Sequence, residues 1–467
     1  MAETDGAPRP SATADSAALP VMGLHQQLEK EPAPRSRVLA WAFWDWGLQP
    51  FHTVIITFIF TALYLTTDAF LAPEMQARGD GDPAKVAAIA GLTSGLGTGT
   101  TIAGLLILLL APVLGQQADA QGRQKLWLGI GTGGVILASL GLWFVEPTPA
   151  LFWLGVALIG VGAVCNEIAV VNNNALLISI STPKNIGRIS GLGWGFGYVG
   201  GVVALAIVIV FYALDWFGLP SENGLPFRLI AVGCALWSVV FALPVFFAVP
   251  EPAPQGRPER RVSFLRSYGV LVRDVIGLYR SPATRNTFWF LLSSAVFRDG
   301  LSGIFTFGAV IASAVYGFGF IEIAVFGLAA NLIAGLSTIL AGRFDDRFGP
   351  KAIIVFSLTS MVVTGLAVFA FVDAGKLVFW IGGLILCAFV GPAQSASRSF
   401  LARVTPAGRE GEIFGLYATT GRATSWMSSL AWTILVSATS ATTFGILGIV
   451  VVLLLGLLLV LPVRPAR

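Results

Sequence analysis

Apolar residues occur along this chain in long runs that short polar stretches separate. A helix that crosses the hydrocarbon core of a bilayer needs about 20 mostly apolar residues, and the sequence contains twelve runs of this kind. The pattern therefore predicts an all-α integral membrane protein with twelve transmembrane helices. The runs lie near residues 38–66, 84–114, 125–145, 150–180, 188–214, 227–249, 286–316, 321–342, 351–372, 377–400, 412–438 and 443–462.

The polar stretches divide the runs into two sets of six, so we expect one bundle over 37–249 and another over 286–467. Residues 1–36 are rich in Ala, Pro and Ser, which predicts a disordered cytoplasmic tail. The connection 250–285 begins with several prolines, and over 263–280 it has one apolar stripe with arginines on a different face. This predicts an amphipathic helix, which either lies on the membrane surface or docks against the protein itself.

Composition excludes the ordinary soluble classes. Of the 467 residues, 55% are hydrophobic and only 12% are charged, whereas a soluble domain carries about 25% charged residues. The cysteines Cys165, Cys234 and Cys387 all lie inside apolar runs, which excludes a disulfide framework and a thiolate zinc site. Neither a nucleophile–base pair nor a metal-ligand spacing is visible. We therefore expect no enzyme activity, no catalytic residue, no metal, no cofactor and no nucleic-acid partner.

Basic residues are concentrated in alternate loops, while the loops between them contain few. Cytoplasmic loops of membrane proteins carry an excess of lysine and arginine. Both termini are therefore predicted to lie in the cytoplasm of a multi-pass plasma-membrane protein, which also requires an even number of spans. The basic loops contain Arg123, Lys125, Lys184, Arg188, Arg343, Arg347, Lys351, Arg403 and Arg409.

Two of these loops share a pattern at matching places in the two halves. The first reads GQQADAQGRQK over 115–125, and the second reads GRFDDRFGPK over 342–351. Glycines there allow tight turns, aspartates could cap a neighbouring helix N-terminus, and basic residues offer ion-pair partners. Together they could latch helices on the cytoplasmic side. The expected latch residues are Gly115, Asp119, Gly122, Arg123, Lys125, Gly342, Asp346, Arg347, Gly349 and Lys351.

The two loops resemble the signature loop of the major facilitator superfamily, G-x-x-x-D-(R)-x-G-(R)-x-K, with Ala120 where arginine is usual. Further stretches look like the vacuolar amino-acid effluxer-like branch, also called the "unknown major facilitator" family. The resemblance covers all twelve runs and implies two pseudo-symmetric six-helix bundles, in which spans 1, 4, 7 and 10 line a central cavity. It also implies amino-acid transport, with export as the favoured direction. The stretches are WAFWDWGLQPF at 41–51, IGRISGLGWGFGYVGG at 186–201, GPAQSASRS at 391–399 and EIFGLY at 412–417.

One glycine-rich stretch has a misleading spacing. Gly195-x-Gly197-x-x-Gly200 matches the dinucleotide-binding fingerprint, but that motif needs a preceding strand in a soluble βαβ unit. Here it falls inside a predicted membrane helix. Gly193, Gly197 and Gly201 are spaced by four, and small residues at that spacing let membrane helices pack closely. We interpret the stretch as a packing surface.

Four charged residues fall near the middle of predicted spans: Glu167, Arg298, Asp299 and Arg422. Charge in the membrane interior costs several kcal/mol and marks candidate functional sites. These charges sum to zero, which leaves two interpretations. They could pair and lock the bundle, or they could bind a zwitterion, with an arginine on its carboxylate and Glu167 or Asp299 on its ammonium group. Arg298 and Asp299 are adjacent and project about 100° apart, so we expect one to face the cavity and the other a neighbouring helix.

Other polar residues lie on the spans that the resemblance assigns to the cavity. We expect His52, Asn166 and Gln394 near the substrate, and Asp45 and Arg398 at the cytoplasmic gate. His52 could be a proton relay or a neutral hydrogen-bonded histidine, and Asp45 could be a gate or a simple helix cap.

A carboxylate whose surroundings change between two conformations could load and release a proton. Glu167 is the first candidate for this role and Asp299 the second.

The sequence thus predicts a secondary transporter that works by alternating access. The first candidate substrate is an amino acid or a related zwitterion, exported and coupled to protons, so that the expected partners are this small molecule, protons and the bilayer. One alternative is an efflux pump for amphipathic drugs, since 13 Trp and 33 Phe could line an apolar cavity. Another is a membrane scaffold or sensor that does not transport, which requires every intramembrane charge to be paired.

Overall fold

The computed structural model describes residues 31–79, 81–215, 222–251, 264–282, 284–318, 320–405, 409–439 and 441–464, and within these ranges the regular structure is entirely helical. Twelve long helical segments follow the twelve apolar runs, so the predicted all-α fold is confirmed. In the described residues, nine helices are long and apolar enough on their own to cross a membrane. The other three crossings are the first, which changes helix type, the eleventh, which is broken, and the shorter last helix. The tail expected over 1–36 lies mostly outside the described residues.

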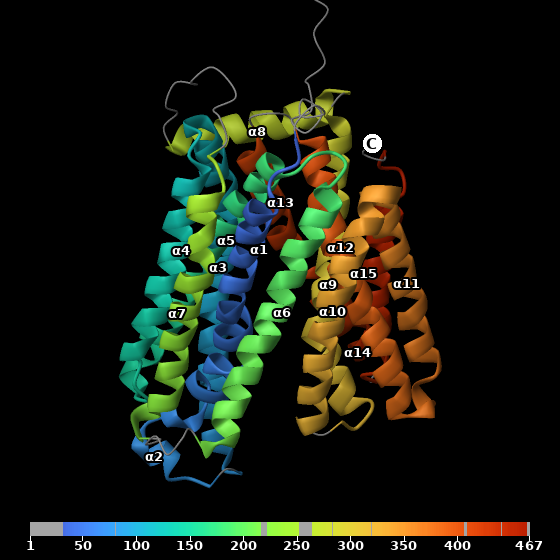
Figure 1. Ribbon diagram of the computed structural model, residues 1–467. Helices are drawn as coiled ribbons and strands as arrows, with labels where there is room; N and C mark the ends of the chain where they lie inside the picture. Colours follow the sequence, from blue (N-terminus) through green and yellow to red (C-terminus); the bar gives the residue numbers. More distant parts are fainter. Residues whose placement is uncertain are drawn as a thin grey trace, which may run out of the picture.

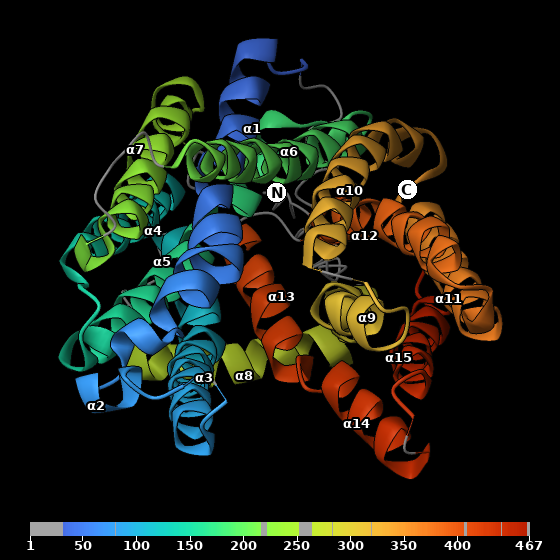
Figure 2. The same ribbon diagram turned by 90° about the horizontal axis from the view of Figure 1, so that it is seen from below.

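The helices form two groups, which are called the N-terminal and the C-terminal bundle (Figures 1 and 2). In the N-terminal bundle the first crossing comprises α1 (Arg35–Pro50) and two π-helices, η2 (Phe51–Phe58) and η3 (Thr61–Leu65); the short α2 (Pro73–Gln76) follows it, and the later crossings are α3 (Pro83–Gln121), α4 (Gln124–Gly141), α5 (Phe152–Ile180), α6 (Ile186–Ala213) and α7 (Leu225–Ala248).

The C-terminal bundle contains α9 (Arg285–Ala314), α10 (Phe320–Phe348), α11 (Pro350–Ala370), α12 (Lys376–Val404), α13 (Glu410–Thr424), α14 (Met427–Thr439) and α15 (Phe444–Val460).

Helix α8 (Phe264–Arg280) forms where the amphipathic pattern predicts it and lies across one end of both bundles (Figure 1). We call this the α8 end. The Tyr268 hydroxyl donates to the Leu109 carbonyl of α3 at 2.9 Å, and Leu278 is 2% exposed. Val272 and Ile276, by contrast, are 59% and 44% exposed. One face of the helix therefore docks on the protein, while the other presents apolar side chains outward, as a helix at a membrane surface would.

The first crossing changes helix type at Pro50, which has no N–H to bond the Trp46 carbonyl four residues earlier. The indole of Trp237 in α7 donates to that carbonyl instead, at 3.1 Å. The π-helix η2 follows, and the hydroxyl of Thr57 donates to the His52 carbonyl at 2.7 Å. Pi-helical turns often occur at functional sites, and His52 lies on this one.

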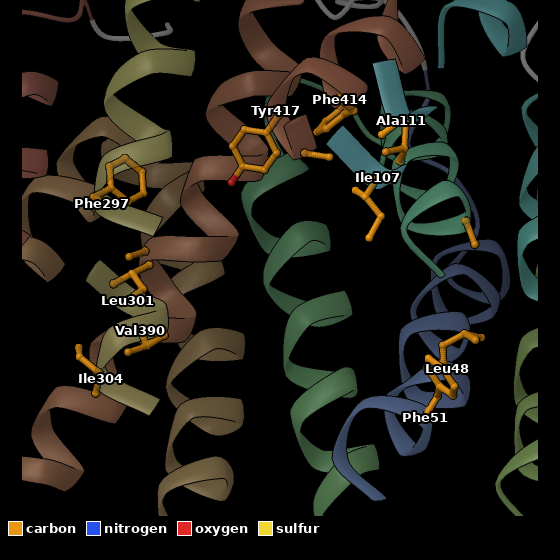
Figure 3. Packing of buried hydrophobic residues seen from close by; sticks show 14 of the residues in the cluster. Leu48, Phe51, Ile107, Ala111, Phe297, Leu301, Ile304, Val390, Phe414 and Tyr417 are labelled. Atoms are coloured by element: carbon orange, nitrogen blue, oxygen red, sulfur yellow. The ribbon is translucent and has the colours of Figure 1, made fainter. Parts of the chain in front are cut away.

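The two bundles meet along helix pairs that are distant in sequence, because α6 packs against α10 and α3 packs against α13. In Figure 1 the ribbons of α6 and α10 converge toward the α8 end and separate toward the opposite end. Figure 3 shows Phe414 of α13 beside Ala111 of α3, within a core whose other members include Phe51 and Phe297. The core thus continues from one bundle to the other at the helix pair α3–α13.

The glycine stretch of 195–200 lies within α6, as the packing interpretation requires. A Cβ atom on Gly193 would lie 2.6 Å from the Trp41 ring of α1, and one on Gly195 would lie 2.9 Å from the Gly335 carbonyl of α10. Glycines thus allow close packing on two faces of α6. One face packs against its own bundle and the other against the C-terminal bundle.

Candidate functional site

Asp346 connects the bundles at the α8 end. Helix α10 ends at Phe348, and Gly349 turns the chain with a φ of +84°. The Asp346 carboxylate accepts the backbone N–H of Gly187 at 2.7 Å and that of Arg188 at 3.0 Å. These N–H groups belong to the first turn of α6, where the helix provides no acceptor. A carboxylate from the C-terminal bundle therefore caps a helix of the N-terminal bundle.

Arg403 and Asp345 lie next to Asp346 on the side of the C-terminal bundle. Nη2 of Arg403 lies 3.4 Å from Asp345 and 3.7 Å from Asp346, and the hydroxyl of Ser399 donates to Asp345. Asp345 is 1% exposed and Arg403 is 7% exposed. Neither residue was predicted as a latch member from the sequence, although the adjacent aspartates at 345 and 346 distinguish the second loop from the first. We call Asp345, Asp346, Ser399 and Arg403 the α8-end latch.

The expectation that Gly115 and Gly342 form turns is wrong, because both lie inside helices. A Cβ atom on Gly115 would overlap the Gly411 carbonyl of α13, and one on Gly342 would lie 2.7 Å from the Gly187 carbonyl of α6. Both glycines instead let the two bundles approach each other. The turns fall at Gly122 and Gly349, which have φ values of +60° and +84°.

In the part of the chain that the structure describes, the expected basic latch residues make no hydrogen bond or ion pair between the bundles. Nζ of Lys125 donates to the Val249 carbonyl at 2.8 Å, and Nζ of Lys351 donates to the Leu461 carbonyl at 2.6 Å. Each lysine therefore binds the chain just beyond a helix of its own bundle, where carbonyl groups lack intrahelical partners. Arg123 and Arg347 are exposed at this end. The side chain of Asp119 lies outside the described part of the chain.

Arg398 of α12 forms the centre of a second contact between the bundles, and it brings together two residues expected at the gate. Its guanidinium donates to the Asn174 amide oxygen at 3.0 Å and to the Ser190 carbonyl at 2.6 Å. Asp45 of α1 lies 3.7 Å from it. Arg398 is 3% exposed, and the ring of Trp41 lies 4.9 Å from the guanidinium carbon. The sequence did not indicate Asn174 or Ser190 as its partners.

Glu167 of α5 and Arg422 of α13 form an ion pair between the bundles near the middle of their crossings. Nη2 of Arg422 lies 3.2 Å from the Glu167 carboxylate, and the two side chains are 44% and 16% exposed. Arg422 lies in the last turn of α13, where a cation is favourable near the helix C-terminus. The pair is therefore far more accessible than the α8-end latch.

His52 and Asn166 lie beside this pair. The Asn166 side-chain nitrogen and Nε2 of His52 are 2.8 Å apart. His52 also interacts electrostatically with Glu167 and Arg422. The Asn166 side-chain oxygen is buried without a hydrogen-bond partner. The structure thus brings together four of the residues expected near the substrate.

Arg298 and Asp299 point to different places, as their spacing predicts. Nη1 of Arg298 donates to the Tyr417 carbonyl at 2.7 Å, and its guanidinium carbon lies 3.7 Å from the centre of the Tyr417 ring. A Cβ atom on Gly421 would lie 2.9 Å from the same guanidinium, so a glycine next to Arg422 makes room for it. Among the ion pairs of the described chain, none involves Arg298.

Asp299 is bound within its own bundle. Its carboxylate accepts the backbone N–H of Ser428 at 2.6 Å and the hydroxyl of Ser428 at 2.7 Å, and it is 5% exposed. Ser428 lies in the first turn of α14, so Asp299 caps the helix that restarts after the break in the eleventh crossing. This placement separates Asp299 from the pair of Glu167 and Arg422.

Gln394 also connects the bundles, because its side-chain oxygen accepts the Tyr198 hydroxyl of α6 at 2.7 Å. The hydrogen bonds and ion pairs that join the bundles in the described chain extend from the α8 end to about the middle of the helices, where Tyr198 and Arg422 lie. In the same described residues, no group of three or more His, Cys, Asp or Glu side chains could hold a metal ion.

Comparisons with known proteins show which family the chain matches. The sequence model of the family described as "Vacuole effluxer Atg22 like" matches residues 33–467. The uncharacterized MFS-type transporter YxiO of Bacillus subtilis (strain 168) is 22% identical over 427 residues, which are 90% of this chain and 93% of that protein. Autophagy-related protein 22 of Cryptococcus neoformans var. neoformans serotype D (strain B-3501A) is 24% identical over 59% of this chain and 51% of its own length.

Solved structures share the fold at low sequence identity. The proton:xylose symporter XylE, a major facilitator superfamily protein solved with 6-bromo-6-deoxy-D-glucose, superposes with a TM-score of 0.71 at 12% identity. The superposition covers 92% of this chain and 96% of that one.

Proposed function

This chain belongs to the Atg22-like vacuole effluxer family of major facilitator superfamily membrane transporters, and from this premise we propose that it moves a small polar solute by alternating access. The lead substrate is an amino acid or a related zwitterion. The observation that carries the proposal is the Glu167–Arg422 ion pair, which joins the two bundles near the middle of their helical crossings. Bundles that rock against each other around a central site change the geometry of a pair that links them, which would couple binding to motion there.

The contacts between the bundles support a state that is closed at the α8 end. Asp346 caps α6 there, and Arg398 binds Ser190 and Asn174. The α8 end also carries the basic residues of the loops, which the positive-inside rule assigns to the cytoplasm. We therefore assign this structure to an outward-facing state in the plasma membrane, with both termini cytoplasmic. Export is our proposed direction because the family is described as effluxers.

Arg298 is our assignment for the carboxylate of the substrate. An isolated cation in the membrane interior is costly, and Arg298 has no carboxylate partner in the described chain. Its contacts with Tyr417 use one nitrogen and one face of the guanidinium, which leaves other N–H groups for a bidentate contact with a carboxylate. Arg422, in contrast, is already paired with Glu167.

Glu167 is our assignment for both the ammonium group and the coupled proton. A substrate ammonium group would compete with Arg422 for its carboxylate, and separation of the bundles would remove Arg422 from it. Either event changes the charge environment that determines whether the carboxylate binds a proton. Asp299, the second candidate, is engaged with Ser428 and buried within one bundle, so we assign it a structural role.

The two alternatives receive less support from the same contacts. A scaffold that does not transport requires every intramembrane charge to be paired, and Arg298 lacks a carboxylate partner among the described residues. A pump for amphipathic drugs needs aromatic side chains around the site. Several large aromatic residues of the N-terminal bundle instead pack against one another, as Trp46 does with Trp237 at a centroid distance of 6.1 Å.

The proposal can be tested with purified protein in liposomes that contain a pH-sensitive dye. A pH gradient is imposed, pooled amino acids are added, and proton flux that depends on substrate is recorded. We expect flux in the native protein and its loss in Glu167→Gln, with substrate binding or exchange retained. The matched control is Glu146→Gln, because Glu146 and Arg228 form a similar pair at 3.3 Å within a single bundle.

Two results would contradict the proposal. Equal flux in Glu167→Gln and the native protein would remove Glu167 from coupling. Absence of both binding and flux with every amino-acid pool, in a protein that still unfolds cooperatively, would remove amino acids as the substrate class.

A further inference from the structure

A cavity of about 610 Å³ lies at the α8 end of the C-terminal bundle. It is formed by the turn between α10 and α11, the end of α12 and the residue that follows α15. Its polar lining comprises Asp346, Arg347, Lys351 and Arg403. Three of these four side chains are cationic, and the fourth, Asp346, already accepts two N–H groups of α6. The cavity therefore has an excess of positive charge.

Arg403 has unused donor capacity in this cavity. Its Nη2 atom binds Asp345 and Asp346, but its Nε atom is buried without a hydrogen-bond partner. Arg403 is 7% exposed, and a buried donor without an acceptor is unfavourable. Arg403 also lines the cavity, so an anion there would lie beside a guanidinium that has not made all of its hydrogen bonds.

The other donors are arranged around the same space. Lys351 uses one N–H of its ammonium group on the Leu461 carbonyl, at 2.6 Å, which leaves two. Arg347 is exposed and lies over the Phe348 ring at 5.3 Å. Helix α11 begins at Pro350 without a side-chain cap, so its first N–H groups, at Lys351 and Ala352, have no partner inside the helix. Uncapped N–H groups together with basic side chains form the usual surroundings of a bound phosphate.

We propose that this cavity binds a phosphate group, and that the phosphate is the headgroup of an anionic phospholipid. The choice of a lipid follows from Phe344 and Phe348, which are 53% and 60% exposed and stack on each other at a centroid distance of 6.4 Å. Phe348 also lines the cavity. A charged cavity with exposed aromatic rings beside it matches a ligand that has a charged head and apolar chains. Free inorganic phosphate has the same head chemistry without the chains.

The test is native mass spectrometry of the full-length protein in detergent, titrated separately with a short-chain phosphatidylglycerol, a short-chain phosphatidylcholine and inorganic phosphate. We expect saturable binding of phosphatidylglycerol at one site and at least tenfold weaker binding of phosphatidylcholine. The double variant Arg347→Gln/Lys351→Gln should bind phosphatidylglycerol about tenfold or more weakly, since each hydrogen bond to a charged group contributes about 1.5–3 kcal/mol. The matched control is Arg343→Gln, because Arg343 is an exposed arginine of α10 outside the cavity.

The double variant replaces residues that are at most partly buried, and its thermal unfolding without lipid should remain cooperative. Arg403→Gln is avoided here because Arg403 also supports the α8-end latch. Equal phosphatidylglycerol affinity in the native protein, the double variant and Arg343→Gln would overturn the site. Phosphate binding that the double variant loses, without preference for the lipid, would support the phosphate site and overturn its assignment to lipid.

Discussion

The α8-end latch and the pair of Glu167 and Arg422 both join the two bundles with charged groups, but they differ in burial. In the latch, Asp345 and Arg403 are 1% and 7% exposed, whereas Arg422 is 44% exposed. Removing one member of a buried ion pair leaves an uncompensated charge and is costly, while an accessible pair contributes little. The latch is therefore suited to hold one conformation, and the accessible pair is suited to exchange partners with a ligand.

Arg403→Gln should have the largest effect, because it leaves Asp345 buried without its cation. We expect the closed α8 end to lose about 3–5 kcal/mol of stability, the range for breaking a buried pair. Spin labels at the exposed positions Lys184 and Arg343, which lie at the α8 ends of the two bundles, would report the change as a longer distance. Asp345→Asn in the same background should restore part of the native distance. A native distance in Arg403→Gln alone would show that the latch does not hold the bundles together.

Arg298→Ala should weaken substrate binding and leave the α8 end closed. A hydrogen bond to a charged group contributes about 1.5–3 kcal/mol, which corresponds to a loss of affinity of about tenfold to a hundredfold. Competition binding in detergent measures this loss, and Arg298→Lys should recover part of it because it restores the charge without the bidentate geometry. Arg280→Ala is the control, since Arg280 is an exposed arginine at the end of α8. Unchanged affinity in Arg298→Ala would assign the carboxylate to a different residue.

Gly342→Ala should open the α8 end without any change of charge. The new Cβ atom would lie 2.7 Å from the Gly187 carbonyl of α6, and overpacking of this kind costs about 1–3 kcal/mol. The spin-label pair described above would again show a longer distance. Gly133→Ala is the control, because a Cβ atom on Gly133 in α4 would meet nothing within 4 Å. If the two variants gave the same distance, close packing at Gly342 would not be needed for closure.

The sequence was sufficient to predict the helices, because long apolar runs determine membrane crossings almost alone. It also indicated that Asp346 could cap a helix, but the identity of that helix depends on the packing of α10 against α6, which sequence spacing does not reveal. The roles of Gly115 and Gly342 were misjudged for the same reason. Small residues near a loop are compatible with a turn and with a close helix contact, and only the approach of the partner helix distinguishes them.

The charged residues near the middle of the helices could be predicted from the sequence, but the partners that they bind were harder to predict. Glu167, Arg298, Asp299 and Arg422 stand out as charges inside apolar runs. The role of Asp299 depends on the break between α13 and α14, and residues 425–426 contain neither Gly nor Pro to signal it. The contacts of Arg298 with Tyr417 likewise depend on two helices that are far apart in sequence.

The smallest effect is expected for Lys376→Gln. This variant tests whether burial or charge pairing makes the α8-end latch stronger than the Glu167–Arg422 pair. Lys376 and Glu322 form an ion pair at 2.7 Å, shorter than any contact of Arg403, but their side chains are 46% and 39% exposed. Exposed pairs contribute about 0–1 kcal/mol, so thermal unfolding in detergent should change little. The distance between labels at the α8 end should also stay native, because Glu322 and Lys376 lie at the starts of α10 and α12, at the opposite end from α8. A loss as large as that of Arg403→Gln would mean that pairing itself, and not burial, gives the latch its strength.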